Sequence, residues 1–160
     1  MQLKLRWKKK FFSNVYRIYN ETQQIGELRK RSFSRTSTAA LNNKKYSFRT
    51  SGFFEQCTEI LDGSENRIGE IRYGSWMTKA TVRLGEETYQ WKYCNTWNSK
   101  WSLHDEDGLR ITYNGSSNSG YINSTTNNPL LLLIGLYISD YYWETLLVVL
   151  LVIFIPIFLT

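Results

Sequence analysis

The feature that most constrains this chain is its apolar C-terminal fifth, which follows a proline. Asn128 is a residue type favoured as an N-cap, and Pro129 suits the first helical position because the N–H it lacks would have no partner there. We therefore expect a helix from about Leu130 to Trp143. Its first turns are apolar on every side, and a helix without a polar face has to be enclosed by protein or by lipid.

The N-terminal part of the chain is strongly basic. The chain has 160 residues, with 42% hydrophobic and 16% aromatic residues, which is typical of one folded domain. Residues 1–49 contain 13 Lys and Arg but only two acidic residues, Glu21 and Glu27. Such an excess favours a polyanionic partner, either nucleic acid or an anionic membrane surface. A basic surface without a partner is the alternative.

Alternating patterns in the first 50 residues predict β-strands. Leu3, Leu5 and Trp7 alternate with basic residues, and this period of two is typical of a strand with one buried face. Asn42 and Asn43 tolerate the left-handed backbone of a tight turn, so they separate two further strands. Four strands are predicted after the first, at residues 15–19, 24–29, 36–41 and 45–50.

An internal repeat extends this pattern over most of the chain. The Ile-Gly-Glu-Leu-Arg sequence at 25–29 returns 43 positions later as Ile-Gly-Glu-Ile-Arg at 68–72, and a shorter third copy follows. The third copy lacks a fourth strand, and the N-terminal strand fills this gap. We therefore expect a closed antiparallel barrel of about twelve strands. A barrel of this size is wider than its own side chains can fill, so we expect the apolar helix inside it.

These features resemble the tubby C-terminal-like superfamily, which includes tubby domains, LURP-one-related proteins and phospholipid scramblases. The resemblance covers about residues 1–143 and rests on the barrel around one hydrophobic helix and on the repeated sequences at 25–29 and 68–72. It implies a function in membrane-lipid handling, since tubby-type members bind phosphoinositide head groups through basic residues and scramblases are proposed to move lipids between leaflets. This chain is shorter than most members, and it continues past the predicted helix.

The continuation, residues 144–160, is predicted to be a membrane anchor. It contains 15 residues without charge, Thr145 to Leu159, whereas roughly 20 span a bilayer core comfortably. Aromatic residues at 141–143 precede it, and no basic residue follows Glu144, which favours a barrel on the cytoplasmic side. Packing of this segment against or inside the barrel is the alternative. The apolar residues assigned to the anchor are Leu146, Leu147, Leu150, Leu151, Ile153, Phe154 and Ile157.

Polar residues interrupt the two apolar runs. Asp140 and Glu144 lie four positions apart and so share a helix face, which is compatible with a paired-carboxylate site. We favour the interpretation that both lie where the chain leaves the barrel and meets water. Pro156 is expected to end or kink the helix near its last turn.

The basic clusters contain the candidate binding residues. Near an anionic leaflet each Lys or Arg contributes on the order of 1 kcal/mol, so several together would keep a domain at the membrane. Phe11 and Phe12 follow one cluster as interfacial aromatic residues do, with burial in the core as the alternative. The candidate lipid-binding residues are Lys8, Lys9, Lys10, Arg29, Lys30, Arg31, Arg35, Lys44, Lys45 and Arg49.

These observations predict a non-catalytic, membrane-associated protein whose partners are anionic lipids. A tail-anchored protein-interaction module and a nucleic-acid-binding barrel are the alternatives, and the apolar tail argues against nucleic acid. His104 is the only histidine, and the acidic turn at 105–108 lacks the spaced ligands of a calcium loop, so we expect no metal and no cofactor. Cys57 and Cys94 are interpreted as free thiols, with a disulfide between them as the alternative. We also expect no signal peptide, since no apolar run follows the N-terminal basic residues.

Overall fold

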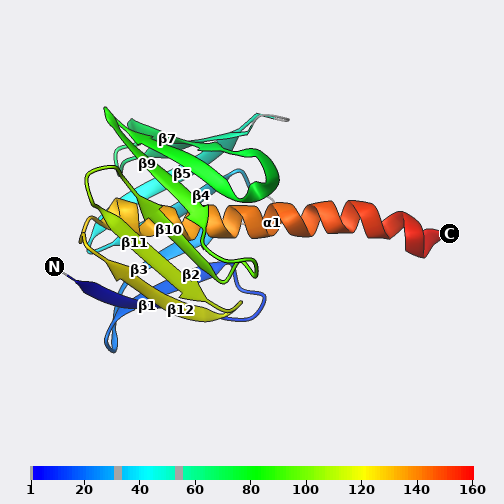
Figure 1. The fold of residues 1–160 in the computed structure, drawn as a ribbon, viewed down its shortest axis with the longest axis horizontal. Coiled ribbons are helices and arrows are strands. Elements are labelled where there is room, and N and C mark those ends of the chain that lie inside the picture. Colours follow the sequence, from blue (N-terminus) through cyan, green and yellow to red (C-terminus); the bar gives the residue numbers. More distant parts are fainter. Residues whose placement is uncertain (1, 31–33, 53–55) are drawn as a thin grey trace.

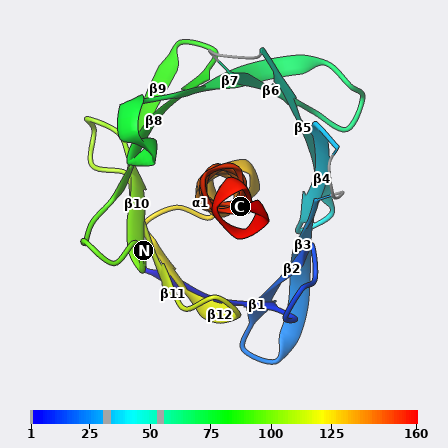
Figure 2. The same cartoon turned by 90° about the vertical axis from the view of Figure 1, so that its right-hand side faces the viewer.

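The computed structural model describes residues 2–30, 34–52 and 56–160. In this part of the chain twelve strands close into one antiparallel barrel, and one α-helix runs along its axis (Figures 1 and 2). The elements are β1 Leu3–Lys9, β2 Val15–Asn20, β3 Gln23–Lys30, β4 Thr36–Leu41, β5 Lys44–Ser51, β6 Cys57–Leu61, β7 Arg67–Tyr73, β8 Lys79–Leu84, β9 Glu87–Tyr93, β10 Lys100–His104, β11 Arg110–Gly115, β12 Ser119–Ser124 and α1 Pro129–Leu159, with a short 3-10 turn at Ser75–Met77.

The N-terminal strand closes the barrel, as the sequence predicts. In β1, Leu5 lies opposite Ile122 of β12, and Trp7 lies opposite Ile18 of β2. The other neighbouring strands in the barrel are consecutive in the sequence. The predicted closed barrel of twelve antiparallel strands around a hydrophobic C-terminal helix is therefore confirmed, and its sheet has no free edge that would favour aggregation.

Two glycines that the repeat places in equivalent positions have the same structural role. A Cβ on Gly26 would collide with Leu41 of the neighbouring strand, and a Cβ on Gly69 would collide with Leu84. Each of these glycines lies beside an irregularity in the pairing of its hairpin. This equivalence fits the 43-residue repeat, which stays a sequence-based prediction.

The first half of α1 fills the barrel. The side chain of Asn128 accepts hydrogen bonds from the backbone N–H groups of Leu130 and Leu131, so the helix begins at the predicted cap. Residues 130–138 are buried and belong to one hydrophobic cluster with inward-facing side chains from around the barrel. The fully enclosed aliphatic residues of the strands include Leu5, Ile18, Leu28, Leu41, Ile60, Ile71, Leu103, Ile111 and Ile122.

Three aromatic side chains attach α1 to the barrel wall. The indole N–H groups of Trp91 and Trp101 both donate to the carbonyl of Gly135, over 3.1 and 3.0 Å. The Tyr113 hydroxyl donates to the carbonyls of Leu131 and Leu132, over 3.1 and 3.0 Å. A Cβ on Gly135 would collide with the Tyr113 ring. The ring can lie against the helix only because residue 135 has no side chain.

The second half of α1 lies outside the barrel. The helix is continuous over 31 residues, roughly 46 Å at 1.5 Å per residue, and its C-terminal half projects from one end of the barrel (Figure 1). Residues 147–160 are exposed, and Leu146 is half-buried. Of the two expectations for Pro156, a helix end at this proline is wrong, since the helix continues to Leu159, and a kink in the last turn stays a prediction.

We expect the Gly135→Ala substitution to lower the free energy of unfolding by about 1–3 kcal/mol, because the added methyl group forces the Tyr113 ring or the helix to shift. Denaturant unfolding of the full chain in detergent, followed by tryptophan fluorescence, measures the change. Gly63→Ala is the control, since a Cβ at this exposed turn has only ordinary contacts. Equal effects of the two substitutions would contradict the proposed role of Gly135.

Candidate functional site

The helix leaves the barrel through one end, which we call the exit rim. Because the strands alternate in direction, every second connection lies at this end (Figure 1). The exit rim consists of the connections at residues 10–14, 31–35, 52–56, 74–78, 94–99 and 116–118, of which 31–33 and 53–55 lie outside the described residues. The start of β1, the start of α1 and the remaining turns lie at the opposite end.

Exposed aromatic side chains gather on the exit rim. Phe11, Phe12, Trp76 and Trp97 lie in three of its connections, and Trp143 lies on α1 as the helix leaves the barrel; their exposed fractions are between 50% and 90%. Other large hydrophobic residues exposed in the described chain are on α1 beyond the rim, with Tyr121 on β12 as the exception. The exposed large hydrophobic residues are therefore concentrated at one end of the molecule, as is typical of a surface that contacts a membrane or a partner.

Two of these aromatic residues have an unfavourable backbone conformation. Phe12 and Trp76 have φ values of 60° and 65°, in the left-handed region that residues with a Cβ rarely adopt. Such residues cost on the order of 1 kcal/mol or more each and tend to occur at functional sites. The burial of Phe11 and Phe12 in the core, one of the two interpretations of the sequence, is wrong, since both side chains are exposed.

The two ends of the barrel also differ in charge. The described connections of the exit rim contain no carboxylate. The strand ends and connections on this side contain Lys8, Lys9, Lys10, Arg35, Lys79 and Lys100. The turns and strand ends at the opposite end contain eight carboxylates, Glu21, Asp62, Glu65, Glu86, Glu87, Asp105, Glu106 and Asp107, and fewer basic residues, among them Lys44, Lys45, Arg67 and Arg110. The barrel is therefore polarised along its axis, with the positive end where the helix leaves.

The predicted basic clusters do not form one surface. Lys8, Lys9, Lys10 and Arg35 lie at the exit rim, and Arg29 and Arg49 are exposed on strand ends beside it. Lys44 and Lys45 begin β5 at the opposite end, roughly 24 Å away along the strand, so they cannot contact the same flat surface as the exit rim. Arg31 lies outside the described residues.

Lys30 differs most from the prediction. Its side chain is 7% exposed, and its Nζ lies 2.6 Å from Asp140 and 2.8 Å from Glu144. The Tyr16 hydroxyl donates to the other oxygen of Asp140 over 2.6 Å. Lys30 is therefore enclosed against the helix, and its assignment as an exposed lipid ligand is wrong. The period of two along β3 turns Lys30 to the same side as the buried Leu28, a signal already present in the sequence.

This cluster compensates for the burial of its charges. Burial by itself lowers the pKa of Lys30, but the negative charges of Asp140 and Glu144 and their hydrogen bonds outweigh it, so the pKa lies above its ordinary value. Burial raises the pKa of Tyr16, and the neighbouring Asp140 raises it further. Both groups therefore keep their protons at neutral pH, Lys30 as a cation and Tyr16 as a hydrogen-bond donor.

The carboxylates and aromatic residues of α1 are placed differently from the expectation. Asp140 is buried and does not meet water, whereas the side chain of Glu144 is half-exposed at the exit. Tyr141 stacks on Tyr73 with ring centroids 3.8 Å apart, and Tyr142 is buried and donates a hydrogen bond to the carbonyl of Lys79. Of residues 141–143 only Trp143 is exposed. The other aromatic side chains at the exit come from the rim connections instead.

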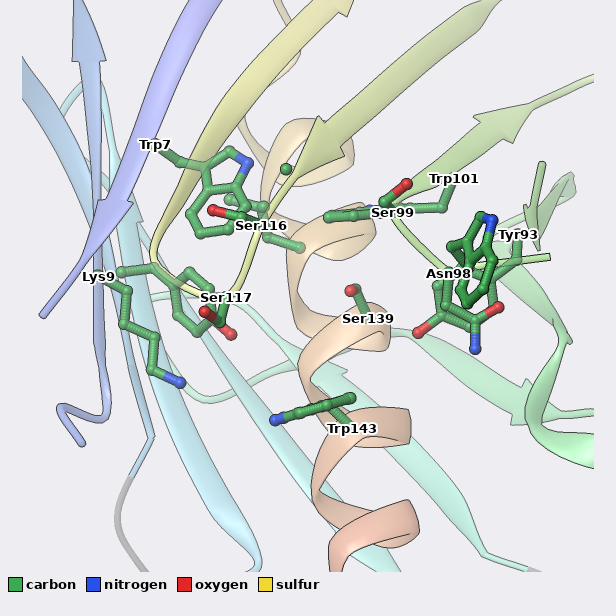
Figure 3. A pocket seen from close by; sticks show the side chains of 14 residues that line it. Trp7, Lys9, Tyr93, Asn98, Ser99, Trp101, Ser116, Ser117, Ser139 and Trp143 are labelled. Carbon is green, nitrogen blue, oxygen red and sulfur yellow. The ribbon is translucent and has the colours of Figure 1, made fainter. Parts of the chain in front are cut away.

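Trp76 and Trp97 are not among the candidate residues predicted from the sequence. The local signal that could have found them is their turn-forming neighbours, Gly74 and Ser75 before Trp76 and Asn95 and Asn98 around Trp97. Cavities flank α1 at the exit. One of about 250 Å³ lies between the helix and residues of β1, β2, β9, β10 and β11, together with the rim connections at 94–99 and 116–118 (Figure 3). A second, of about 260 Å³, lies beside Lys30 and Arg35.

Comparisons of the chain with protein-family models, curated proteins and solved structures found no match. The resemblance to the tubby C-terminal-like superfamily therefore stays a sequence-based prediction.

Cys57 and Cys94 are free thiols in the structure. In the described part of the chain, no three His, Cys, Asp or Glu residues group as metal ligands would.

We expect Lys30→Met to lower the free energy of unfolding by about 3–5 kcal/mol, because it leaves the buried carboxylate of Asp140 without its cation. The double substitution Lys30→Met and Asp140→Leu should recover most of this loss, since it removes both charges. Thermal unfolding of the full chain in detergent measures both effects. A double variant no more stable than the Lys30→Met variant would contradict the role of this ion pair.

Proposed function

We propose that the protein is a non-catalytic membrane protein that holds its barrel against an anionic bilayer surface, with α1 beyond the exit rim as its transmembrane anchor. One observation supports this most directly: an exposed apolar helix projects from the same rim that has the exposed aromatic and basic side chains. The proposal has the exit rim at the level of the lipid head groups and the acidic end of the barrel facing away from the bilayer.

The length and composition of α1 support a membrane anchor. The helix is long and apolar enough to cross a membrane, with a mean hydropathy of 2.4 over its most apolar 18 residues. Residues 143–159 extend roughly 26 Å as a helix, close to the roughly 30 Å of a bilayer core. The seven residues assigned to the anchor from the sequence all lie on this segment. If these apolar side chains stayed in water, each would lose the roughly 1.5–3 kcal/mol of stabilisation that its burial provides.

The composition of the exit rim supports its position at the bilayer surface. Tryptophan and tyrosine are enriched where membrane proteins meet the head groups, and Trp143 lies where the exposed part of the helix begins. Lys8, Lys10 and Arg35 would lie beside an anionic leaflet. Since basic residues next to a transmembrane helix favour the cytoplasmic side, we propose a cytoplasmic barrel.

A tail-anchored protein-interaction module is the second candidate function. In the proposed orientation the carboxylates of the opposite end, among them Asp62, Glu86 and Glu106, face away from the membrane. This end would suit a cationic protein partner. Nucleic acid fits less well, because the basic rim that it would need lies against the lipid.

The anchor is tested by the double substitution Leu150→Arg and Ile153→Arg. Each arginine near the middle of a transmembrane helix costs about 3 kcal/mol, so we expect the full chain, synthesised in the presence of liposomes, to become extractable at alkaline pH. Adding two arginines at the opposite end, by Gln23→Arg and Ser64→Arg, should leave the chain resistant to extraction. Resistance of both variants would refute the anchor.

The orientation of the barrel is tested by charge reversal. With Lys8, Lys10 and Arg35 changed to Glu, we expect the preference for phosphatidylglycerol over neutral vesicles in flotation to fall by at least about 100-fold, since each charge contributes on the order of 1 kcal/mol. Lys44→Glu with Lys45→Glu, at the far end of β5, should change this preference little. A larger effect of the second variant would reverse the proposed orientation.

A further inference from the structure

The cavity beside α1 at the exit rim has two chemically different sides (Figure 3). Lys9, Ser116 and Ser117 lie on one side, whereas Tyr93 and Asn98 lie on the other (Figure 3). Ser139 and Trp143 project from the helix between these two sides (Figure 3). Among the described residues that line the cavity there is no Asp or Glu. A ligand that fits these surroundings has an anionic group on the first side and a group that favours aromatic rings on the other.

The first side of the cavity offers a cation and a hydrogen-bond donor that has no acceptor. The Nζ of Lys9 lies 5.3 Å from the centroid of the Tyr16 ring, and no carboxylate within the described residues forms an ion pair with it. Trp7 also lines the cavity; its side chain is 3% exposed, and its indole N–H has no hydrogen-bond acceptor in the described structure. A buried donor without a partner costs about 1–3 kcal/mol, and an acceptor that came within its reach would recover this energy.

The aromatic residues offer a site for a cation without N–H groups. The rings of Tyr93, Trp97 and Trp143 line the cavity, together with the rings deeper in the wall. In the absence of a lining carboxylate, a positive charge can be stabilised by the faces of these rings. A quaternary ammonium group needs no hydrogen-bond acceptor, whereas a primary ammonium group would need several. The aromatic side therefore suits a trimethylammonium group best.

The geometry points to the phosphocholine head group of a membrane phospholipid as the ligand of this cavity. Its trimethylammonium group lies among the rings of Tyr93, Trp97 and Trp143, and its phosphate lies beside Lys9. The volume of about 250 Å³ is small for a complete ligand, since pockets for drug-sized molecules have roughly 300–1,000 Å³. The head group alone enters, and the acyl chains stay in the bilayer beside α1. The lipid as the source rests on the proposed function, because the membrane must lie at the exit rim.

The first experiment titrates the full chain in a maltoside detergent with soluble phosphocholine, choline and glycerol phosphate, followed by tryptophan fluorescence. We expect phosphocholine to bind at least about tenfold more tightly than either of the other two, because only phosphocholine uses both sides of the cavity. Equal binding of glycerol phosphate would show a simple anion site. Equal binding of choline would show a simple cation site, and either result, or no saturable binding, overturns the inference.

Substitutions separate the two sides of the cavity. Lys9→Gln should weaken phosphocholine binding about tenfold and remove its advantage over choline, and Trp97→Ala should weaken it similarly and remove its advantage over glycerol phosphate. Lys4→Gln is the matched control, since Lys4 is on the same strand and lies over an aromatic ring, Tyr121, but outside the cavity. Tyr121→Ala is the aromatic control. Loss of binding in either control, or unchanged selectivity in the two cavity variants, would overturn the inference.

A second experiment identifies the source of the head group. With the full chain in phosphatidylglycerol nanodiscs, adding phosphatidylcholine should weaken the binding of soluble phosphocholine several-fold, because the lipid head group then occupies the cavity. Unchanged binding would overturn the lipid as ligand. The two proposals fail separately. If the chain inserts into the membrane but does not bind phosphocholine, only the cavity assignment is overturned. If the chain binds phosphocholine but is extracted by alkaline treatment, only the proposed anchor is overturned.

Discussion

The enclosure of α1 is the interaction on which the rest of the structure depends. The helix has no polar face, so a sheet on one side could not cover it, and only a closed wall can exclude water from the whole of its first half. A barrel of about eight strands fills its own interior, so a helix needs a wider one. Twelve strands, closed by β1 between β12 and β2, provide this space. The second half of the same helix is exposed in the described structure, and in the proposed function lipid encloses it.

Polar contacts give this apolar packing a definite register. In a lumen of aliphatic side chains, several rotations and depths of a leucine-rich helix would have similar energies. The indole hydrogen bonds to Gly135 and the ion pair between Lys30 and Asp140 are satisfied in only one arrangement. Buried ion pairs add little net stability because desolvation opposes them, so we infer that this pair contributes mainly to specificity. The register also sets where Trp143 leaves the barrel.

The alternation of strand direction separates two surfaces. Every second connection lies at the exit rim, so the aromatic residues Phe12, Trp76 and Trp97 lie at the same end of the barrel although they are far apart in the sequence. The same alternation sends the acidic turns to the other end. The proposed function follows from this polarity together with the projecting helix. The cavity next to Trp143 lies where aromatic and basic residues of the rim meet the helix, which is why a lipid head group suits it.

The sequence by itself determined the features that obey short-range rules: the helix start at Asn128 and Pro129, the period of two in the strands, and the need for one more strand, which β1 supplies. Capping and strand alternation act within a few residues, so a single sequence displays them. Only the tertiary structure decided which basic residues share a surface. Lys30 is enclosed because its partner Asp140 lies 110 positions later, and Lys44 is remote from the exit rim because β5 runs the length of the barrel. Such pairings depend on barrel closure and helix register, which no local pattern records.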